Sequence, residues 1–228
     1  MNDLAQKLIE ELQCETVFTI PVLGGIPVSE AVVVTWIIMA VLVIAAFILT
    51  RNLKVDHISK RQAVAESIVT GLMNMVQGMV GEKGRKYVPY LTTVMLYIGV
   101  SNIIGLFGFK SPTKDLRVTV ALALMTIILI EAAAIYHKGV KRWIHGYVEP
   151  VAIVTPINIL EVVTKPLSLC MRLFGNVLGA FVIMELLKMI LPVGLPVVFS
   201  LYFDIFDGLL QAYVFVFLTS LYIDEITE

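Results

Sequence analysis

Apolar segments long enough to cross a bilayer alternate with short charged segments along most of this chain. The first apolar segment covers residues 31–50, and two more follow at 87–109 and 118–136. A helix of about 20 residues measures about 30 Å, which is the thickness of the hydrocarbon core of a membrane. The pattern predicts three membrane-spanning helices at these positions.

Residues 58–80 show a different periodicity, in which apolar side chains recur at steps of three and four. The apolar positions are Ala65, Ile68, Val69, Leu72, Val76, Met79 and Val80, and polar residues such as Gln62 and Gln77 fall on the other side. This spacing is typical of an amphipathic helix. We expect it to lie on the cytoplasmic membrane surface or to pack over its neighbours.

The last third of the chain departs from the pattern of simple spans. Residues 156–191 form one apolar segment in which several charged residues are embedded, and residues 197–223 form a second. A continuous helix over 156–191 would be longer than the bilayer core is thick, so we expect strong tilt or a kink, for which Pro166 offers a site. The two segments predict a hairpin of two long, strongly tilted membrane helices.

The charges between the spans predict the orientation of the chain. Basic clusters follow the first span, precede the second and follow the third; they contain Arg51, Lys54, Lys60, Arg61, Lys83, Arg85, Lys86, Lys138, Lys141 and Arg142. Basic loops favour the cytoplasmic side. We therefore expect residues 1–30 and the N-terminus to lie outside and the C-terminus to lie in the cytoplasm.

Composition fits an all-α, multi-spanning membrane protein with a single membrane domain over residues 1–228. Hydrophobic residues make up 58% of the chain and charged residues 15%, against about 25% charged in soluble domains. The net charge of −1 gives no reason to expect a nucleic-acid partner. The expected partner on this ground is the lipid bilayer.

We expect no cofactor, metal site or catalytic residue in this chain. It has no glycine-rich phosphate loop and no His-Glu-x-x-His pattern. His57, His137 and His145 fall in or beside the predicted cytoplasmic loops, and Cys14 and Cys170 lie in different settings. No metal-ligand or disulfide framework follows from these residues.

The two C-terminal helices carry facing polar stripes. Arg172 and Asn176 are four residues apart on one helix, beside Gly175 and Gly179, and the second helix carries Asp204, Asp207 and Gln211 at steps of three and four. Arginine stays charged in proteins, and a charge at the bilayer centre costs about 2.5–3.5 kcal/mol on insertion scales. Ionisable residues inside a membrane usually line an ion or proton path.

Most of these residues also have a simpler interpretation. Glu185 and Lys188 are as well explained by pairing with each other as by an ion path, and pairing is the favoured interpretation of Glu161 with Lys165. Asp207 is open to local capping or pairing, and the two glycines to helix packing. Arg172 differs from them, because its own helix offers no acidic residue one turn away.

The polar blocks resemble the signatures of subunit a of the F-type ATP synthase. The block Lys165-Pro-Leu-Ser-Leu followed by Arg172-Leu-Phe-Gly-Asn176 is similar to the first signature, and Gln211-Ala-Tyr-Val-Phe-Val-Phe to the second. Gly81-Glu-Lys-Gly-Arg-Lys-Tyr-Val-Pro-Tyr, Ser101-Asn-Ile-Ile-Gly-Leu and Ser111-Pro-Thr-Lys-Asp match earlier blocks in the right order. The resemblance covers nearly the whole chain from residue 30 onward.

The resemblance implies a role for each matching polar residue. Arg172 would face the rotating ring of c subunits, with Asn176 and Gln211 as polar neighbours along the ion path. Asn102 would lie toward the cytoplasmic half-channel. Phe181 stands where many members have glutamate, and Asp204 where many bacterial members have histidine. From these departures we infer that Asp204, helped by Glu185, replaces that polar pair in the outer half-channel.

The function implied is that of a non-catalytic, ion-conducting stator subunit of the ATP synthase. Two offset half-channels would pass H⁺ or Na⁺ to and from the ring carboxylates, and Arg172 would separate them. The implied partners are the c ring, the b subunits of the peripheral stalk and the rest of the synthase, in a bacterial cell membrane. Alternatives are an ion-coupled secondary transporter, for which the inverted repeats are missing, another membrane proton channel, or a non-conducting anchor.

Overall fold

The computed structural model describes residues 16–21, 26–51, 59–82, 84–107, 109, 111–146, 155–190, 194 and 199–227. The basic residues Lys54 and Lys83, His57 and Cys14 lie outside the described residues. Two short strands come first, β1 (Thr16–Ile20) and β2 (Ile26–Ser29), which pair antiparallel. This hairpin was not predicted, although the Pro21 and Gly24–Gly25 turn signals lie at or between its strands.

The first two helices differ in how much of their surface this chain covers. α2 (Glu30–Thr50) buries Ala31, Val34 and Ile38, all near its start, and leaves most of its apolar side chains exposed. α3 (Lys60–Val80) begins at Ser59, whose Oγ accepts a hydrogen bond from the Gln62 backbone N–H at 3.3 Å. It ends at Gly81, which has φ +71°; this conformation suits glycine because it has no Cβ.

Short 3₁₀ turns flank the next two long helices. η1 (Arg85–Tyr87) leads into α4 (Val88–Ile103), which continues as η2 (Ile104–Phe107). η3 (Pro112–Lys114) leads into α5 (Leu116–Lys138), and α6 (Val140–Gly146) follows after the bend at Gly139. The Asp115 carboxylate caps α5 by accepting from the Arg117 N–H at 2.9 Å. It also accepts from the Ser29 hydroxyl at 3.0 Å, which fastens the start of α2 to the start of α5.

The C-terminal part contains the longest helix and a wide turn of helix. α7 (Thr155–Ile190) has 36 residues and continues through Pro166. Its length of about 54 Å, at 1.5 Å per residue, requires tilt in a bilayer core about 30 Å thick. η5 (Leu201–Asp207) is a π-helix that runs directly into α9 (Gly208–Thr227). The π-helix was not predicted.

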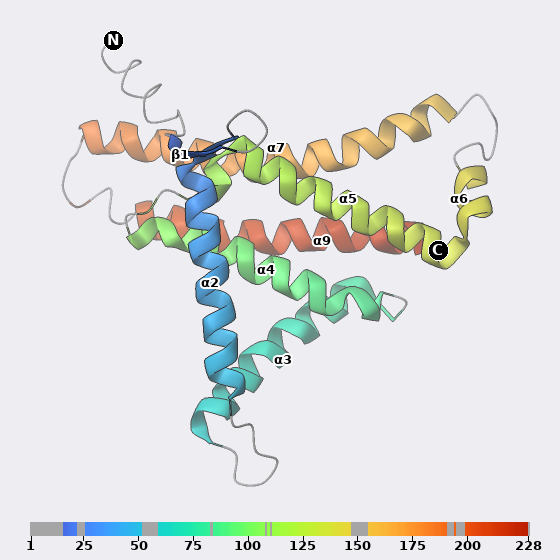
Figure 1. The fold of residues 1–228 in the computed structure, drawn as a ribbon, viewed down its shortest axis with the longest axis horizontal. Helices are drawn as coiled ribbons and strands as arrows, with labels where there is room; N and C mark the ends of the chain where they lie inside the picture. The colour runs from blue at the N-terminus through green and yellow to red at the C-terminus, as the bar shows by residue number, and fades with distance from the viewer. Residues whose placement is uncertain are drawn as a thin grey trace.

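Four long helices run alongside one another in the picture and α2 crosses them (Figure 1). α4, α5, α7 and α9 form this group, and α3 extends obliquely from α4 toward the far end of α2. The predicted second and third spans lie along the C-terminal hairpin rather than parallel to α2. Among the described residues, six helices are long and apolar enough to cross a membrane. The prediction of an all-α, multi-spanning architecture is confirmed.

The core forms where α9 packs against its neighbours. Its residues Ala212, Phe215, Val216 and Ile223 are almost completely buried. Val216 and Ile223 belong to a cluster with Val76 and Val80 of α3, so the C-terminal half of the amphipathic helix packs over its neighbours. The apolar residues Ile68 and Val69 in its first half are exposed. The two ends of this helix therefore have different surroundings.

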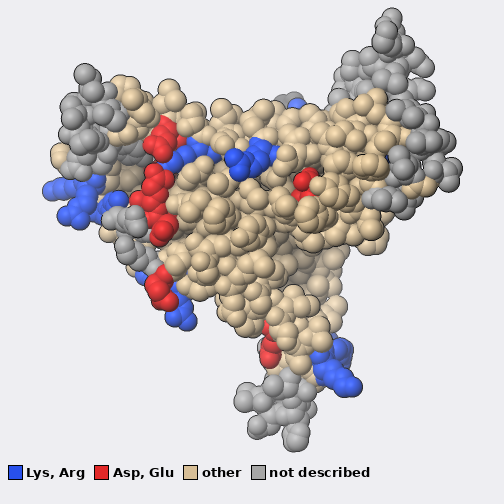
Figure 2. All heavy atoms as spheres, turned by 180° about the vertical axis from the view of Figure 1, so that it is seen from behind, with Lys and Arg blue, Asp and Glu red and all other residues tan. Residues whose placement is uncertain are grey.

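Charged side chains are distributed unevenly over the surface (Figure 2). In that view, acidic and basic spheres gather at the end where α6 and the C-terminus of α9 lie, and the face beyond is mostly uncharged. Isolated basic groups interrupt this uncharged face. Such a face suits contact with lipid or with another apolar membrane protein.

Candidate ion-translocation site

Arg172 lies on an exposed face of α7. In the part of the chain that the structure describes, its guanidinium has no hydrogen-bond or ion-pair partner. A Cβ built on Gly175 or Gly179 meets no atom within 4 Å. The predicted packing role of these glycines is therefore not fulfilled within the described chain, and the space beside Arg172 is open to another molecule.

The adjacent, buried side of α7 limits the direction in which Arg172 points. Leu169, Cys170 and Leu173 are buried, and the Cys170 Sγ lies 3.5 Å from the Thr119 hydroxyl of α5. Leu169 and Leu173 pack in the same cluster as Phe215 of α9. Buried and exposed positions follow the helical period of α7. These three side chains lie on its buried side, and Arg172 lies on the exposed side next to it.

Asn176 and Gln211 meet across the hairpin, as the facing stripes predicted. The Asn176 Nδ2 donates to the Gln211 Oε1 at 2.5 Å. Gln211 is only 1% exposed, and its Nε2 has no partner among the described residues. A buried amide donor without a partner is unusual and calls for water or a ligand group. This donor lies beside the helix that carries the arginine.

Asn102 and Asp204 form a second polar cluster, between η5 and the end of α4. The Asn102 Nδ2 donates to the Gly208 carbonyl at 3.0 Å, and the Thr113 hydroxyl donates to the Asn102 Oδ1 at 2.8 Å. The Asp204 carboxylate accepts from the Ser200 hydroxyl at 2.6 Å. It also lies against Gly105, where a Cβ would be 3.1 Å from its Oδ1.

This geometry bears on where Asn102 and Asp204 lie relative to each other. The expectation placed Asn102 toward the cytoplasmic half-channel and Asp204 in the outer one. Asn102 is nevertheless at the end of α4 away from the basic Arg85–Lys86 pair, one turn before the glycine that touches Asp204. The two residues therefore belong to one region. The cause is the antiparallel packing of α4 on η5 and α9, which the resemblance of separate sequence blocks did not reveal.

Glu185 pairs with Lys188, the simpler of its two interpretations. The Lys188 Nζ lies 2.6 Å from the Glu185 carboxylate within the same helix. Four residues before Glu185, the Phe181 ring lies under the ammonium of Lys114, 2.9 Å from the ring centroid. Asp204 and Glu185 thus have different partners. Local pairing was an alternative interpretation of Asp207. Its carboxylate has no hydrogen-bond or ion-pair partner among the described side chains.

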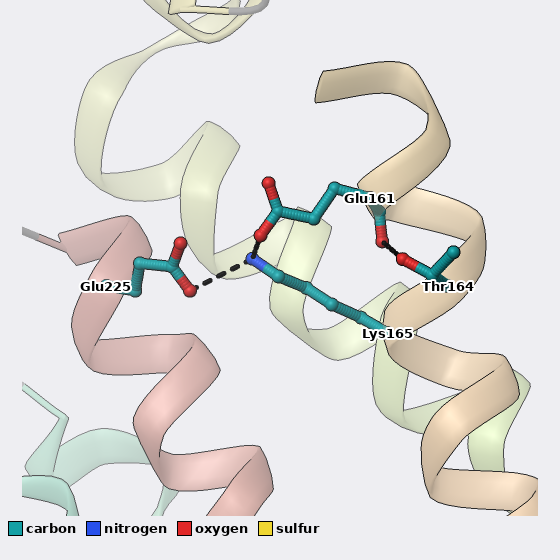
Figure 3. Close-up of polar contacts among 4 residues, drawn as sticks. All are labelled: Glu161, Thr164, Lys165 and Glu225. Carbon is teal, nitrogen blue, oxygen red and sulfur yellow. Dashed lines mark hydrogen bonds and ion pairs between the residues drawn. The ribbon is translucent and has the colours of Figure 1, made fainter. Parts of the chain in front are cut away.

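Lys165 joins the N-terminal part of α7 to the C-terminal end of α9 (Figure 3). Its ammonium lies 3.0 Å from the Glu161 carboxylate and 2.9 Å from that of Glu225. The pairing of Glu161 with Lys165 was predicted. The contact with Glu225 was not predicted, because nothing in a single sequence relates residues 60 apart. The helical spacing of Lys165 from Glu161 indicated only the pair within α7.

The described residues offer no group of three or more His, Cys, Asp and Glu side chains that could hold a metal ion. What they bring together is a fixed positive charge on an open apolar face, with two polar clusters near it. Such an arrangement can stabilise a passing anion and can provide hydrogen-bonding groups for an ion or for water.

Comparison with known proteins identifies the family. A family model described as "ATP synthase A chain" matches residues 32–224. ATP synthase subunit a of Moorella thermoacetica is 36% identical over 203 residues, which cover 88% of this chain and 92% of that protein. The sodium-ion-specific subunit a of Propionigenium modestum is 35% identical over 215 residues, covering 87% of this chain and 74% of that protein. Subunit a 1 of Crocosphaera subtropica is 30% identical over 200 residues, with 87% and 86% covered. This chain belongs to the ATP synthase A chain family and is a multi-pass subunit of the membrane sector of that complex.

Proposed function

We propose that this chain is the stator subunit that conducts H⁺ or Na⁺ past a rotating ring of c subunits. Two offset half-channels lead the ion to and from ring carboxylates, and Arg172 separates them. The observation that carries the proposal is the exposed, unpartnered Arg172 among the described side chains, beside two glycines that face open space. Small residues allow another helix to approach closely.

The charge of Arg172 explains the separation. A carboxylate about 4 Å away is attracted by about 4 kcal/mol at an effective dielectric constant near 20. An opposite charge favours the ionised form of a carboxyl group. A ring carboxylate therefore passes Arg172 without its ion, and the fixed positive charge blocks a direct path for cations. The potential contributes about 2.3 kcal/mol per charge for each 100 mV.

The outer half-channel runs through the Asn102 and Asp204 cluster. Asp204 supplies the negative charge that attracts a cation, and the hydroxyls of Ser200 and Thr113 hold the two side chains in place. Local π-helix often occurs at functional sites, and here it presents Asp204. Glu185, neutralised by Lys188, lies along the same helix as Arg172 and assists at the outer mouth.

Asn176 and Gln211 provide polar groups next to the arginine. Their mutual hydrogen bond uses one donor of Asn176 and the acceptor of Gln211. The buried Gln211 Nε2 then remains to donate to a water molecule on the ion path. The b subunits of the peripheral stalk are the proposed partners of the surfaces that the ring leaves free. In this proposal the chain lies in a bacterial cell membrane, with its N-terminus outside and its C-terminus in the cytoplasm.

The proposal is tested by Arg172→Ala in the assembled synthase, reconstituted into vesicles. We expect ion-driven ATP synthesis to be abolished while the complex still assembles, because Arg172 makes no hydrogen bond or ion pair with the described chain. Arg142→Ala is the matched control, since it removes an exposed arginine from α6, and it should retain synthesis. Synthesis by the Arg172→Ala complex would contradict the proposal.

A further inference from the structure

Polar side-chain contacts join α7 to α9 on both sides of Arg172 along the helix. Asn176 and Gln211 form the first, four residues after the arginine. Lys165 and Glu225 form the second, seven residues before it. Seven residues are close to two helical turns, so Lys165, Arg172 and Asn176 lie on one face of α7.

Lys165 is held more firmly than an ordinary surface lysine. Its side chain is 15% exposed and touches carboxylates from two helices, within 3.0 Å of each (Figure 3). The ammonium also lies 5.1 Å from the centre of the Tyr222 ring of α9. A lysine restrained by two carboxylates and a ring has few rotamers left. It can therefore restrain the rotation of the helix that carries it.

The C-terminal end of α9 needs a positive charge. Asp224 and Glu225 lie in its last turn, where acidic side chains are unfavourable because the helix dipole is negative there. Lys165 supplies a cation to this end. Without it, repulsion between Glu225 and Glu161 would favour separation of the two helices at this point.

We infer that Lys165 is a positioning residue for Arg172. Its contact with Glu225, together with the contact of Asn176 with Gln211, fixes the rotation of α7 and so the direction of the guanidinium. This inference rests on the proposed function, in which the guanidinium must meet a carboxylate carried by another protein. An error of about 1 Å in such a placement can lower a rate by on the order of 100-fold.

The test compares four variants of the assembled complex in vesicles. Lys165→Met should lower the maximal rate of ATP synthesis per assembled complex by at least about tenfold, with little change in the ion concentration that gives half the maximal rate. Lys165→Arg, and the exchange Lys165→Glu with Glu225→Lys, should restore most of that rate, because both keep one cation among two carboxylates. Lys141→Met is the matched control, since it removes an exposed lysine from α6, and it should keep the rate.

A role in folding alone would lower the amount of complex and leave the rate per complex unchanged. That result, or a rate in Lys165→Met equal to that of the unmodified protein, would overturn the inference, as would failure of both restoring variants. Failure of this inference is distinguishable from failure of the proposed function. Synthesis by the Arg172→Ala complex contradicts the proposed function, whereas the outcomes above concern Lys165 while Arg172 is in place.

Discussion

At the scale of single residues, the useful contrast is between the charges of α7 that pair with another side chain and Arg172, which does not. Lys165, Glu161, Glu185 and Lys188 satisfy one another or a neighbouring helix. Arg172 lies on the same helix without such a partner in the described part of the chain. Since an unpaired charge in a membrane is unfavourable, the proposed function assigns its partner to another molecule.

Asp204 should control the entry of the ion. Replacing Asp204 with Asn removes the negative charge but keeps the shape and the ability to accept from Ser200. We expect slower ion uptake into vesicles, by at least about tenfold, which corresponds to the loss of about 1.4 kcal/mol of attraction, with Arg172 in place. Glu82→Asn, outside the helices, should leave the flux unchanged, and unchanged flux in Asp204→Asn would exclude Asp204 from the path.

The residue chemistry was largely predictable from sequence, whereas the pairing of residues was not. The charge of Arg172 and the facing of Asn176 and Gln211 follow from helical spacing. The grouping of Asn102 with Asp204 does not follow from spacing, because it depends on the register in which α4 packs along α9. That register is set by packing among residues distant in sequence.

At the scale of helices, the register of α4 on α9 depends on one close approach. A Cβ on Gly208 would lie 2.8 Å from the Asn102 Cβ, a distance that real side chains do not adopt. Glycine at this position therefore allows Asn102 to reach the Gly208 carbonyl. The same interface carries Gly99, where a Cβ would be 3.6 Å from Leu209 and so in ordinary contact.

Gly208→Ala should therefore destabilise the protein by about 1–3 kcal/mol, the usual range for overpacking. Thermal unfolding of the protein in detergent, followed by circular dichroism, measures the effect as a lower midpoint. Gly99→Ala, on the same interface, should change the midpoint little. Equal midpoints for the two variants would show that the close approach at Gly208 does not set the register.

At the scale of the whole molecule, the tilt of α7 was predictable from its length, but the alignment of α4 and α5 with it was not. A span of ordinary length fits a bilayer either upright or tilted, so length alone does not decide. The structure aligns them because α9 buries its apolar side chains against α3, α4 and α5. The outcome is a group of inclined helices that presents Arg172 on an open face.

The central claim is that a ring helix passes this open face beside Arg172. The most direct measurement is disulfide formation between two introduced cysteines. One is Gly175→Cys, in a chain that also carries Cys14→Ser and Cys170→Ser. The other is a single cysteine in the ring subunit, one turn from its carboxylate. We predict a cross-linked product of this chain with the ring subunit on oxidation of the assembled complex, and none from Gly78→Cys on α3, where a Cβ also meets open space. Absence of the product from Gly175→Cys, or equal yields from the two positions, would contradict the account.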